Sequence, residues 1–392
     1  MTTNALARQL FSAYEHYKLD HLNPKNCKHD KIFSELFELV VKSDRLMSME
    51  EIGTSIEGRS INLITVGKGQ RKVLLWSQMH GDESTATLAL MDIFSAILRR
   101  SSEDHWIEEM LHDVTLHFIP MLNPDGAERV DRRTAVGIDM NRDALDLATP
   151  EARILREMQR RLKPAFGFNL HDQELSSVGN SKNVTAIALL APAADEKKTK
   201  PPVRVRAMRV ASVIARALGQ FAPGHLASYD DAFEPRAFGD NMQRWGTSTV
   251  LIESGQWPRD SEKSFIRKLN YVGILTAIQS IATGSFQDVS LDYYSDLAMN
   301  SKRLYDIIIR DVKLRHPTGW DHPVDIGLLF DAELNKGKER TIVTIKDVGD
   351  LSTYGALEII DGAARTIRTE QLALNQSLAL TEFLDIVQLP HL

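Results

Sequence analysis

The stretch KVLLWSQMHGDESTATLALMDIFSAILRR, Lys72–Arg100, decides the fold of this chain. The apolar run Val73–Ser77 predicts a strand and Thr85–Leu98 predicts a helix, an order typical of an α/β unit. Between them stand His80 and Glu83, which share a face on a first helical turn because they are three residues apart. An imidazole and a carboxylate at one point suit Zn²⁺. The pattern is short enough to arise by chance, so a metal site needs support from further residues.

Three further apolar runs lead into polar residues with metal-binding or acid/base chemistry. They are Phe118–Leu122, which runs into the turn Asn123–Gly126, Ala165–Leu170, which ends on His171, and Thr249–Ile252, which ends on Glu253. Read as strands, these runs bring the polar residues to the carboxyl edge of a sheet. That edge is where open α/β sheets bind their ligands.

Six short segments between Glu51 and Gly255 occur in the order of a known family. They are EIGTSIEGRSI (Glu51–Ile61), MHGDE (Met79–Glu83), NPDG (Asn123–Gly126), GIDMNRD (Gly137–Asp143), NLH ending at His171, and IESG around Glu253. Together they resemble the zinc carboxypeptidases, the carboxypeptidase A-like metallopeptidases. Each segment alone is a weak signal, and their joint order carries the resemblance.

The expected fold is α/β, with a mixed central sheet flanked by helices, over a catalytic domain of residues 1–285. The small, polar segment Thr283–Ser290 is the expected junction. Beyond it the pattern becomes strand-like, which predicts a small, mostly β accessory domain over residues 290–392, closed by a strand at Phe383–Leu389.

The resemblance implies one catalytic zinc ion held by His80, Glu83 and His171. Catalytic zinc sites use three protein ligands and leave a fourth position for water, which the ion acidifies. Asp172 and Glu174 follow His171 and leave a second ion open.

Further roles follow from the same resemblance. Asp139 would accept the free ring N–H of a ligating histidine, and its alternative role is to stabilise the turn at Gly137. Glu253 would be the general base, since a carboxylate at the end of a buried strand can have a raised pKa. Its alternative is an ordinary solvated carboxylate. Arg132 would stabilise the oxyanion, with Arg133 as the fallback.

Asn141 and Arg142 match the pair that holds the free C-terminal carboxylate of a substrate, the arginine through a forked ion pair. The alternative for Arg142 is an ion pair with Asp143 or Asp146. Tyr229 is the best match to a tyrosine that closes over the substrate. Without that role, it would be a half-buried packing residue.

The implied activity is hydrolysis of the last peptide bond, or of a related amide, beside a free carboxylate. Two alternatives stay open: a zinc-dependent deacylase of N-acyl amino acids on the same scaffold, and a peptide-binding relative without catalysis. The sequence also leaves open which side chain the enzyme prefers at the C-terminus of its substrate. Asp240 and Arg244, both in the expected specificity segment, carry opposite charges and predict opposite preferences.

Composition fits an enzyme and excludes other classes. The chain has 392 residues, 43% of them hydrophobic, and a net charge of −6 without a basic cluster, which argues against nucleic-acid binding. The sequence contains no apolar run of the ~18 residues that span a bilayer, so no membrane insertion is expected. With Cys27 as the single cysteine and no visible secretory signal, we expect a cytoplasmic protein without intrachain disulfides.

Overall fold

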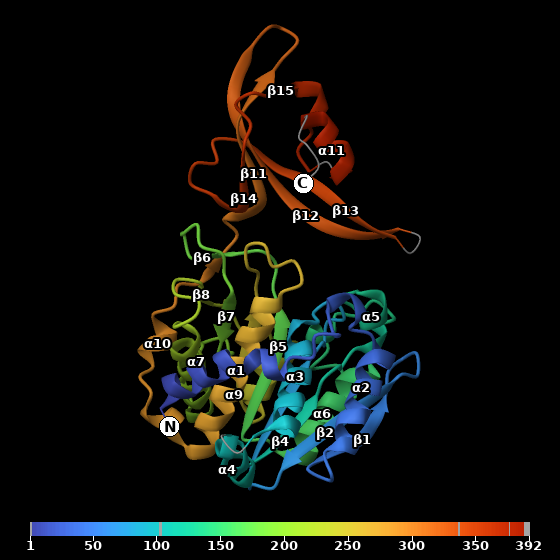
Figure 1. Ribbon diagram of the computed structural model, residues 1–392, viewed down its shortest axis with the longest axis vertical. Helices are drawn as coiled ribbons and strands as arrows, with labels where there is room; N and C mark the ends of the chain where they lie inside the picture. Colours follow the sequence, from blue (N-terminus) through green and yellow to red (C-terminus); the bar gives the residue numbers. More distant parts are fainter. Residues whose placement is uncertain (1, 102–103, 336–337, 376, 388–392) are drawn as a thin grey trace. The chain divides into compact units, whose positions relative to one another are not determined.

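The computed structural model describes residues 2–101, 104–335, 338–375 and 377–387 (Figure 1). The chain forms two compact units. The first comprises Met1–Glu174, Ala186–Gln256 and Asp260–Asn300, and the second Leu175–Thr185, Trp257–Arg259 and Ser301–Leu392. In the described part of the chain, no helix combines the length and apolar character that crossing a membrane requires.

An eight-stranded sheet forms the centre of the first unit, in the order β1-β2-β4-β3-β5-β9-β7-β8. Its strands are β1 (Met47–Thr54), β2 (Ser60–Gly67), β3 (Arg71–Ser77), β4 (Val114–Ile119), β5 (Phe166–Asp172), β7 (Ile187–Leu190), β8 (Leu226–Ser228) and β9 (Ser248–Ser254). The central strands β4, β3, β5 and β9 run parallel, whereas β1, β2 and β7 pair antiparallel with their neighbours toward the centre. The expected mixed α/β fold is therefore confirmed.

Helices cover this sheet, and their apolar faces build the core. They are α1 (Thr3–Tyr17), α2 (His29–Lys42), α3 (Thr85–Arg99), α4 (His105–Asp113), α5 (Pro124–Arg129), α6 (Pro150–Leu162), α7 (Pro202–Leu218), α8 (Phe238–Arg244), α9 (Ser264–Thr283) and α10 (Asp292–Ser295). On one face, Leu74 and Trp76 of β3 pack with Leu155 of α6 and Phe238 of α8. The helices α1, α3 and α7 pack against α9, which is buried on nearly all sides as its apolar sequence predicts.

Two expected elements near the site differ from the structure. The strand placed at Phe118–Leu122 is instead β4, which ends at Ile119, because Pro120 has no N–H for the ladder. The turn expected at Asn123–Gly126 is the start of helix α5. There the side chain of Asn123 caps the helix by accepting a hydrogen bond from the Gly126 N–H at 3.0 Å.

The second unit is built on a six-stranded sheet in the order β14-β11-β12-β13-β16, with β15 paired to β11. Its elements are β11 (Leu304–Arg315), β12 (Asp321–Asn335), β13 (Lys338–Gly349), β14 (Gly355–Asp361), β15 (Thr366–Arg368), β16 (Ser377–Ala379) and α11 (Leu380–Val387). The short strands β6 (Ser177–Val178) and β10 (Asn300–Ser301) pair with each other in a separate two-stranded sheet. The strand expected at Phe383–Leu389 is wrong, since residues through Val387 are helical and bury Phe383 and Leu384. Residues 388 and 389 lie outside the described residues.

Candidate metal centre

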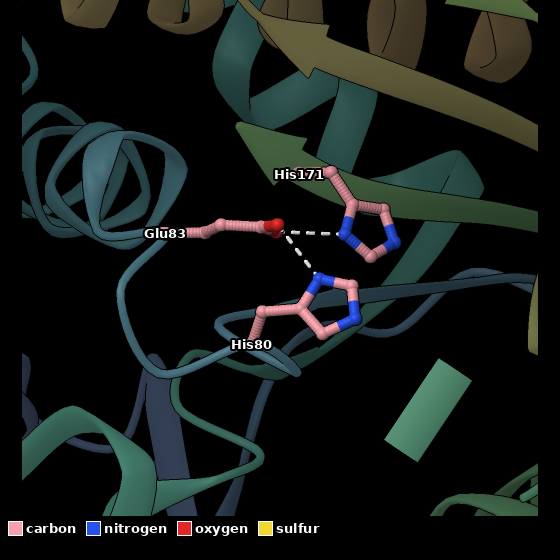
Figure 2. A group of neighbouring side chains, drawn as sticks. All are labelled: His80, Glu83 and His171. Carbon is pink, nitrogen blue, oxygen red and sulfur yellow. Dashed lines mark hydrogen bonds and ion pairs between the residues drawn. The ribbon is translucent and has the colours of Figure 1, made fainter. Parts of the chain in front are cut away.

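Three buried side chains meet at the carboxyl edge of the large sheet (Figure 2). Nδ1 of His80 lies 2.7 Å from Oε1 of Glu83, and Nδ1 of His171 lies 2.7 Å from Oε2 of the same carboxylate. One ligand atom from each residue lies within 4.8 Å of the others. Two imidazole nitrogens and a carboxylate oxygen form a donor set that suits Zn²⁺.

Strand pairing explains why these residues meet. His80 and Glu83 lie in the turn between β3 and α3, and the Glu83 N–H donates to the His80 carbonyl at 3.2 Å. His171 lies in β5, which runs parallel to β3 with Leu170 opposite Ser77. The end of β5 therefore reaches the turn that follows β3, although His171 is far from Glu83 in sequence.

Close main-chain packing fixes the shape of the metal-binding turn. The Gly81 N–H donates to the Asp131 carbonyl at 3.0 Å. A Cβ atom at position 81 would lie 2.0 Å from the carbonyl carbon of Gly126, so only glycine fits there. The adjacent Gln78 has a positive φ of 51°, and its side-chain amide donates to the Gly81 carbonyl at 2.9 Å.

Burial and the neighbouring charges shift the pKa of each of these three residues. Burial raises the pKa of Glu83, but the two imidazoles outweigh it and hold that pKa below its ordinary value. Burial lowers the pKa of His171, which favours a neutral ring. An ionised carboxylate and a neutral imidazole are the forms that bind a metal.

Asp139 contacts the far side of the His80 ring. Its Oδ1 lies 3.1 Å from Nε2 of His80 and also accepts from the Asn141 N–H at 2.9 Å. An ionised carboxylate only accepts, and His80 faces one through each ring nitrogen, Asp139 at Nε2 and Glu83 at Nδ1. Burial lowers the pKa of His80, but these two carboxylates outweigh it and raise that pKa above its ordinary value. Asp139 therefore contacts the His80 ring and caps the short helix η3 (Met140–Arg142), whereas the turn at Gly137 is held by the hydrogen bond from the Gly137 N–H to the Thr134 carbonyl.

The structure distinguishes the two neighbouring arginines. Arg132 contacts the group directly, with Nη1 at 3.1 Å from Nδ1 of His80 and at 3.3 Å from Oε1 of Glu83. Its other nitrogens, Nε and Nη2, donate to Asp139 at 3.3 and 3.1 Å. Arg133 donates instead to the Gly137 carbonyl at 2.9 Å.

Glu253 stands beside this group inside β9, directly opposite His171 in the strand register. It is buried, and burial together with the negative charges of Glu83 and Asp172 raises its pKa well above the ordinary value. Tyr229, half-buried just after β8, is close enough to interact electrostatically with Glu253. Burial, followed by that carboxylate, raises the pKa of Tyr229 to about 12.

Asn141 and Arg142 lie next to the start of α8. Asn141 accepts from the Phe238 N–H at 2.9 Å, and Nε of Arg142 lies 3.4 Å from Oε2 of Glu234. Arg142 therefore pairs with Glu234 rather than with Asp143 or Asp146, the partners considered from the sequence. Asp143 accepts instead from the N–H and hydroxyl of Thr149.

Two polar contacts near the site have no signal in the sequence. Oδ2 of Asp172 accepts from the hydroxyl of Thr85 at 2.6 Å and from Nζ of Lys263 at 3.0 Å. Both distances are those of ordinary hydrogen bonds, so this carboxylate oxygen is already engaged. Within the described ranges, His80, Glu83 and His171 are the one group of three or more His, Cys, Asp or Glu residues that could hold an ion.

Comparison with known proteins points to the same family as the sequence segments. Residues 33–183 match the family model for zinc carboxypeptidase. Carboxypeptidase 2 of Trichophyton rubrum is 23% identical over 154 residues, covering 36% of this chain and 28% of that protein. Carboxypeptidase E of Caenorhabditis elegans is 28% identical over 153 residues, covering 34% and 32%. The match spans about a third of the length of these relatives.

Solved structures share the fold. A metallo-carboxypeptidase from Burkholderia cenocepacia superposes with a TM-score of 0.52 at 15% identity, covering 66% of this chain and 69% of that one. The carboxypeptidase A from Helicoverpa armigera gives 0.51 at 15% identity, covering 72% and 80%. The family resemblance inferred from the six segments is confirmed.

Proposed function

The chain carries a zinc carboxypeptidase domain, and on that premise we propose that it hydrolyses the C-terminal peptide bond, or a related amide beside a free carboxylate. The observation that carries this proposal is the convergence of His80, Glu83 and His171 on one point in a buried setting. Family and fold support a metallocarboxypeptidase-like activity.

His80, Glu83 and His171 would hold the zinc ion. When bound, the ion supplies acidification of a water molecule and polarisation of the substrate carbonyl. With the ion bound, Asp139 would accept the proton on Nε2 of His80 and leave Nδ1 as the ligand atom.

Glu253 is the proposed general base. Its raised pKa brings it closer to the range in which a carboxylate can take a proton from water and return it to the leaving amine. Arg132 is the proposed electrostatic stabiliser, because its guanidinium already contacts the metal-binding group and can face the charge that develops on the carbonyl oxygen.

Substrate recognition would depend on the free carboxylate. Arg142 keeps 41% of its side-chain surface exposed, and its pair with Glu234 is at 3.4 Å, so its guanidinium is available to a substrate carboxylate. Asn141 lies beside it, and the charge of Glu253 contributes to the raised pKa of Tyr229. Peptides and peptide-like molecules with a free C-terminus are the expected substrates.

The test compares Glu253→Gln with the unmodified protein in zinc content and in turnover of a peptide panel. We expect Glu253→Gln to bind zinc normally and to lose about 10²–10⁴-fold in turnover, the usual contribution of a general base. His80→Ala should lose both zinc and turnover. Glu262→Gln, on an exposed residue, is the matched control and should change neither.

A parallel panel of N-acyl amino acids separates peptidase from deacylase activity. Normal turnover in Glu253→Gln would show that another group is the base. Faster cleavage of N-acyl amino acids than of any peptide would replace the peptidase proposal with the deacylase alternative.

A further inference from the structure

A cavity of about 340 Å³ opens beside Glu83 and Arg132. Its wall includes Thr85 at the start of α3, the ion pair of Asp172 and Lys263, and Pro24 from the N-terminal part of the chain. Pro24 lies outside the stretch 33–183 that matches the zinc carboxypeptidase family. A segment outside the family match therefore forms part of the wall beside the proposed active site.

The cavity is separate from the proposed carboxylate grip. Among the described residues, its lining contains neither Asn141 nor Arg142, which contact Phe238 and Glu234 instead. Under the proposed function the terminal carboxylate binds there and the scissile bond lies at the metal group. The cavity then faces the acyl side of the substrate, upstream of the scissile bond.

Pro24 belongs to a segment, Lys18–Lys28, that we call the N-terminal strap. One end of the strap is held by α9, where the buried guanidinium of Arg267 donates to the Leu22 carbonyl at 2.7 Å and to the Leu19 carbonyl at 3.3 Å. Asp92 of α3 accepts from the Leu19 N–H at 2.9 Å. The start of the strap is thus fixed to two core helices.

The other end of the strap is fixed to α5. Nζ of Lys28 donates to the carbonyls of Ala127 and Glu128 at 2.8 and 2.9 Å. Between these anchors, the side chain of Asn23 caps the short helix η1 (Pro24–Asn26) and keeps Pro24 at its first position. Moving Pro24 away from the cavity would break several of these hydrogen bonds.

We propose that the N-terminal strap is a specificity element, in which Pro24 limits the acyl part of the substrate to about one or two residues. This inference rests on the proposed function. A volume of 340 Å³ is near the lower end of the roughly 300–1,000 Å³ that ligand pockets occupy. Apart from Pro24, the residues that line the wall have polar or charged side chains.

The experiment measures kcat/KM for N-acetylated alanine peptides with one to five residues before a constant C-terminal residue. We expect kcat/KM to fall at least about tenfold once the acyl part exceeds two residues, the scale of discrimination that pocket fit supplies. Pro24→Gly should raise kcat/KM for the longest peptide by about the same factor and leave the shortest unchanged. Pro24→Phe should lower it for peptides with a two-residue acyl part.

Lys25→Ala is the matched control, since Lys25 is exposed on the same short helix and does not line the cavity. Thermal unfolding verifies that each variant is folded. A flat length series in the unmodified protein, or an unchanged series in both folded Pro24 variants, would overturn the inference while the proposed function stands. Failure of the zinc-loaded protein to cleave any peptide would overturn both.

Discussion

Asp92 and Arg267 form an ion pair in the core between α3 and α9, with Nε of Arg267 2.7 Å from Oδ2 of Asp92. Their side chains are 0% and 4% exposed, and the hydroxyl of Tyr14 donates to the same carboxylate at 2.8 Å. The pair therefore ties α1 and the N-terminal strap to the two helices. A buried charge that loses its partner is costly, because neither water nor another cation replaces it.

Arg267→Ala should lower the free energy of unfolding by about 3–5 kcal/mol, since Asp92 would remain buried and unpaired. Urea unfolding followed by circular dichroism measures the change. Lys42→Ala removes an exposed pair with Glu38 and should cost less than about 1 kcal/mol. Equal losses in the two variants would mean that the buried pair contributes no more than a surface one.

Asp139→Asn should weaken zinc binding by about 10–100-fold, the usual effect of removing a carboxylate that orients a ligating histidine. Competition with a chromogenic chelator measures the affinity. Asp146→Asn, which changes an exposed aspartate without a contact to His80, should bind zinc as the unmodified protein does. Unchanged affinity in Asp139→Asn would show that the contact at 3.1 Å does not orient the ring.

Removal of zinc should lower the unfolding temperature, because an ion that binds only the folded state adds about 2.7 kcal/mol at a hundredfold excess over its Kd. The measurement is a thermal melt after chelation, with and without added zinc. His171→Ala should abolish the zinc-dependent shift. A shift of full size in that variant would place the ion elsewhere.

The contribution of Asp240 to stability should fall as the pH rises from about 4 to about 7. Burial raises the pKa of Asp240 to about 7, whereas an aspartate in the unfolded chain titrates near 3.9. In this window the folded state keeps a proton that the unfolded state releases, so each pH unit costs up to about 1.4 kcal/mol. Above pH 7 this contribution is constant.

Asp240→Asn removes that titration and should therefore be more stable than the unmodified protein at pH 7.5 but not at pH 4.5. Urea unfolding at the two pH values measures the difference, and Asp146→Asn serves as the control. An advantage of Asp240→Asn that is equal at both pH values would contradict the raised pKa.

The bounds of strands and helices are predicted best where the local sequence pattern is strong. The expected strand at Val73–Ser77 and helix at Thr85–Leu98 lie within one or two residues of β3 and α3, because both stretches are mostly apolar. The predicted strand Phe118–Leu122 lies too far along the chain, because the apolar residues after Ile119 suggested that the strand continues. These residues are buried but are not paired in the sheet. The short apolar run at Phe383 is compatible with a helix or a strand, and in the structure it belongs to helix α11.

Contacts between distant residues limited the prediction of the site. The His80 and Glu83 pair follows from local spacing, whereas the contact of Arg142 with Glu234 and that of Asp172 with Lys263 arise only when separate elements pack together. Pro24 lies in a segment without any motif, so its position in the cavity wall could not be read from the sequence.

The contact between Gly81 and Gly126 joins two stretches that are apart in the chain. No side chain fits between their main chains, so the first turn of α5 constrains the shape of the metal-binding turn. Transplanting residues 78–85 alone into another scaffold would therefore not reproduce the geometry of His80 and Glu83. The smallest portable unit includes Asn123–Arg129 as well, and a designer should treat both pieces as a single part.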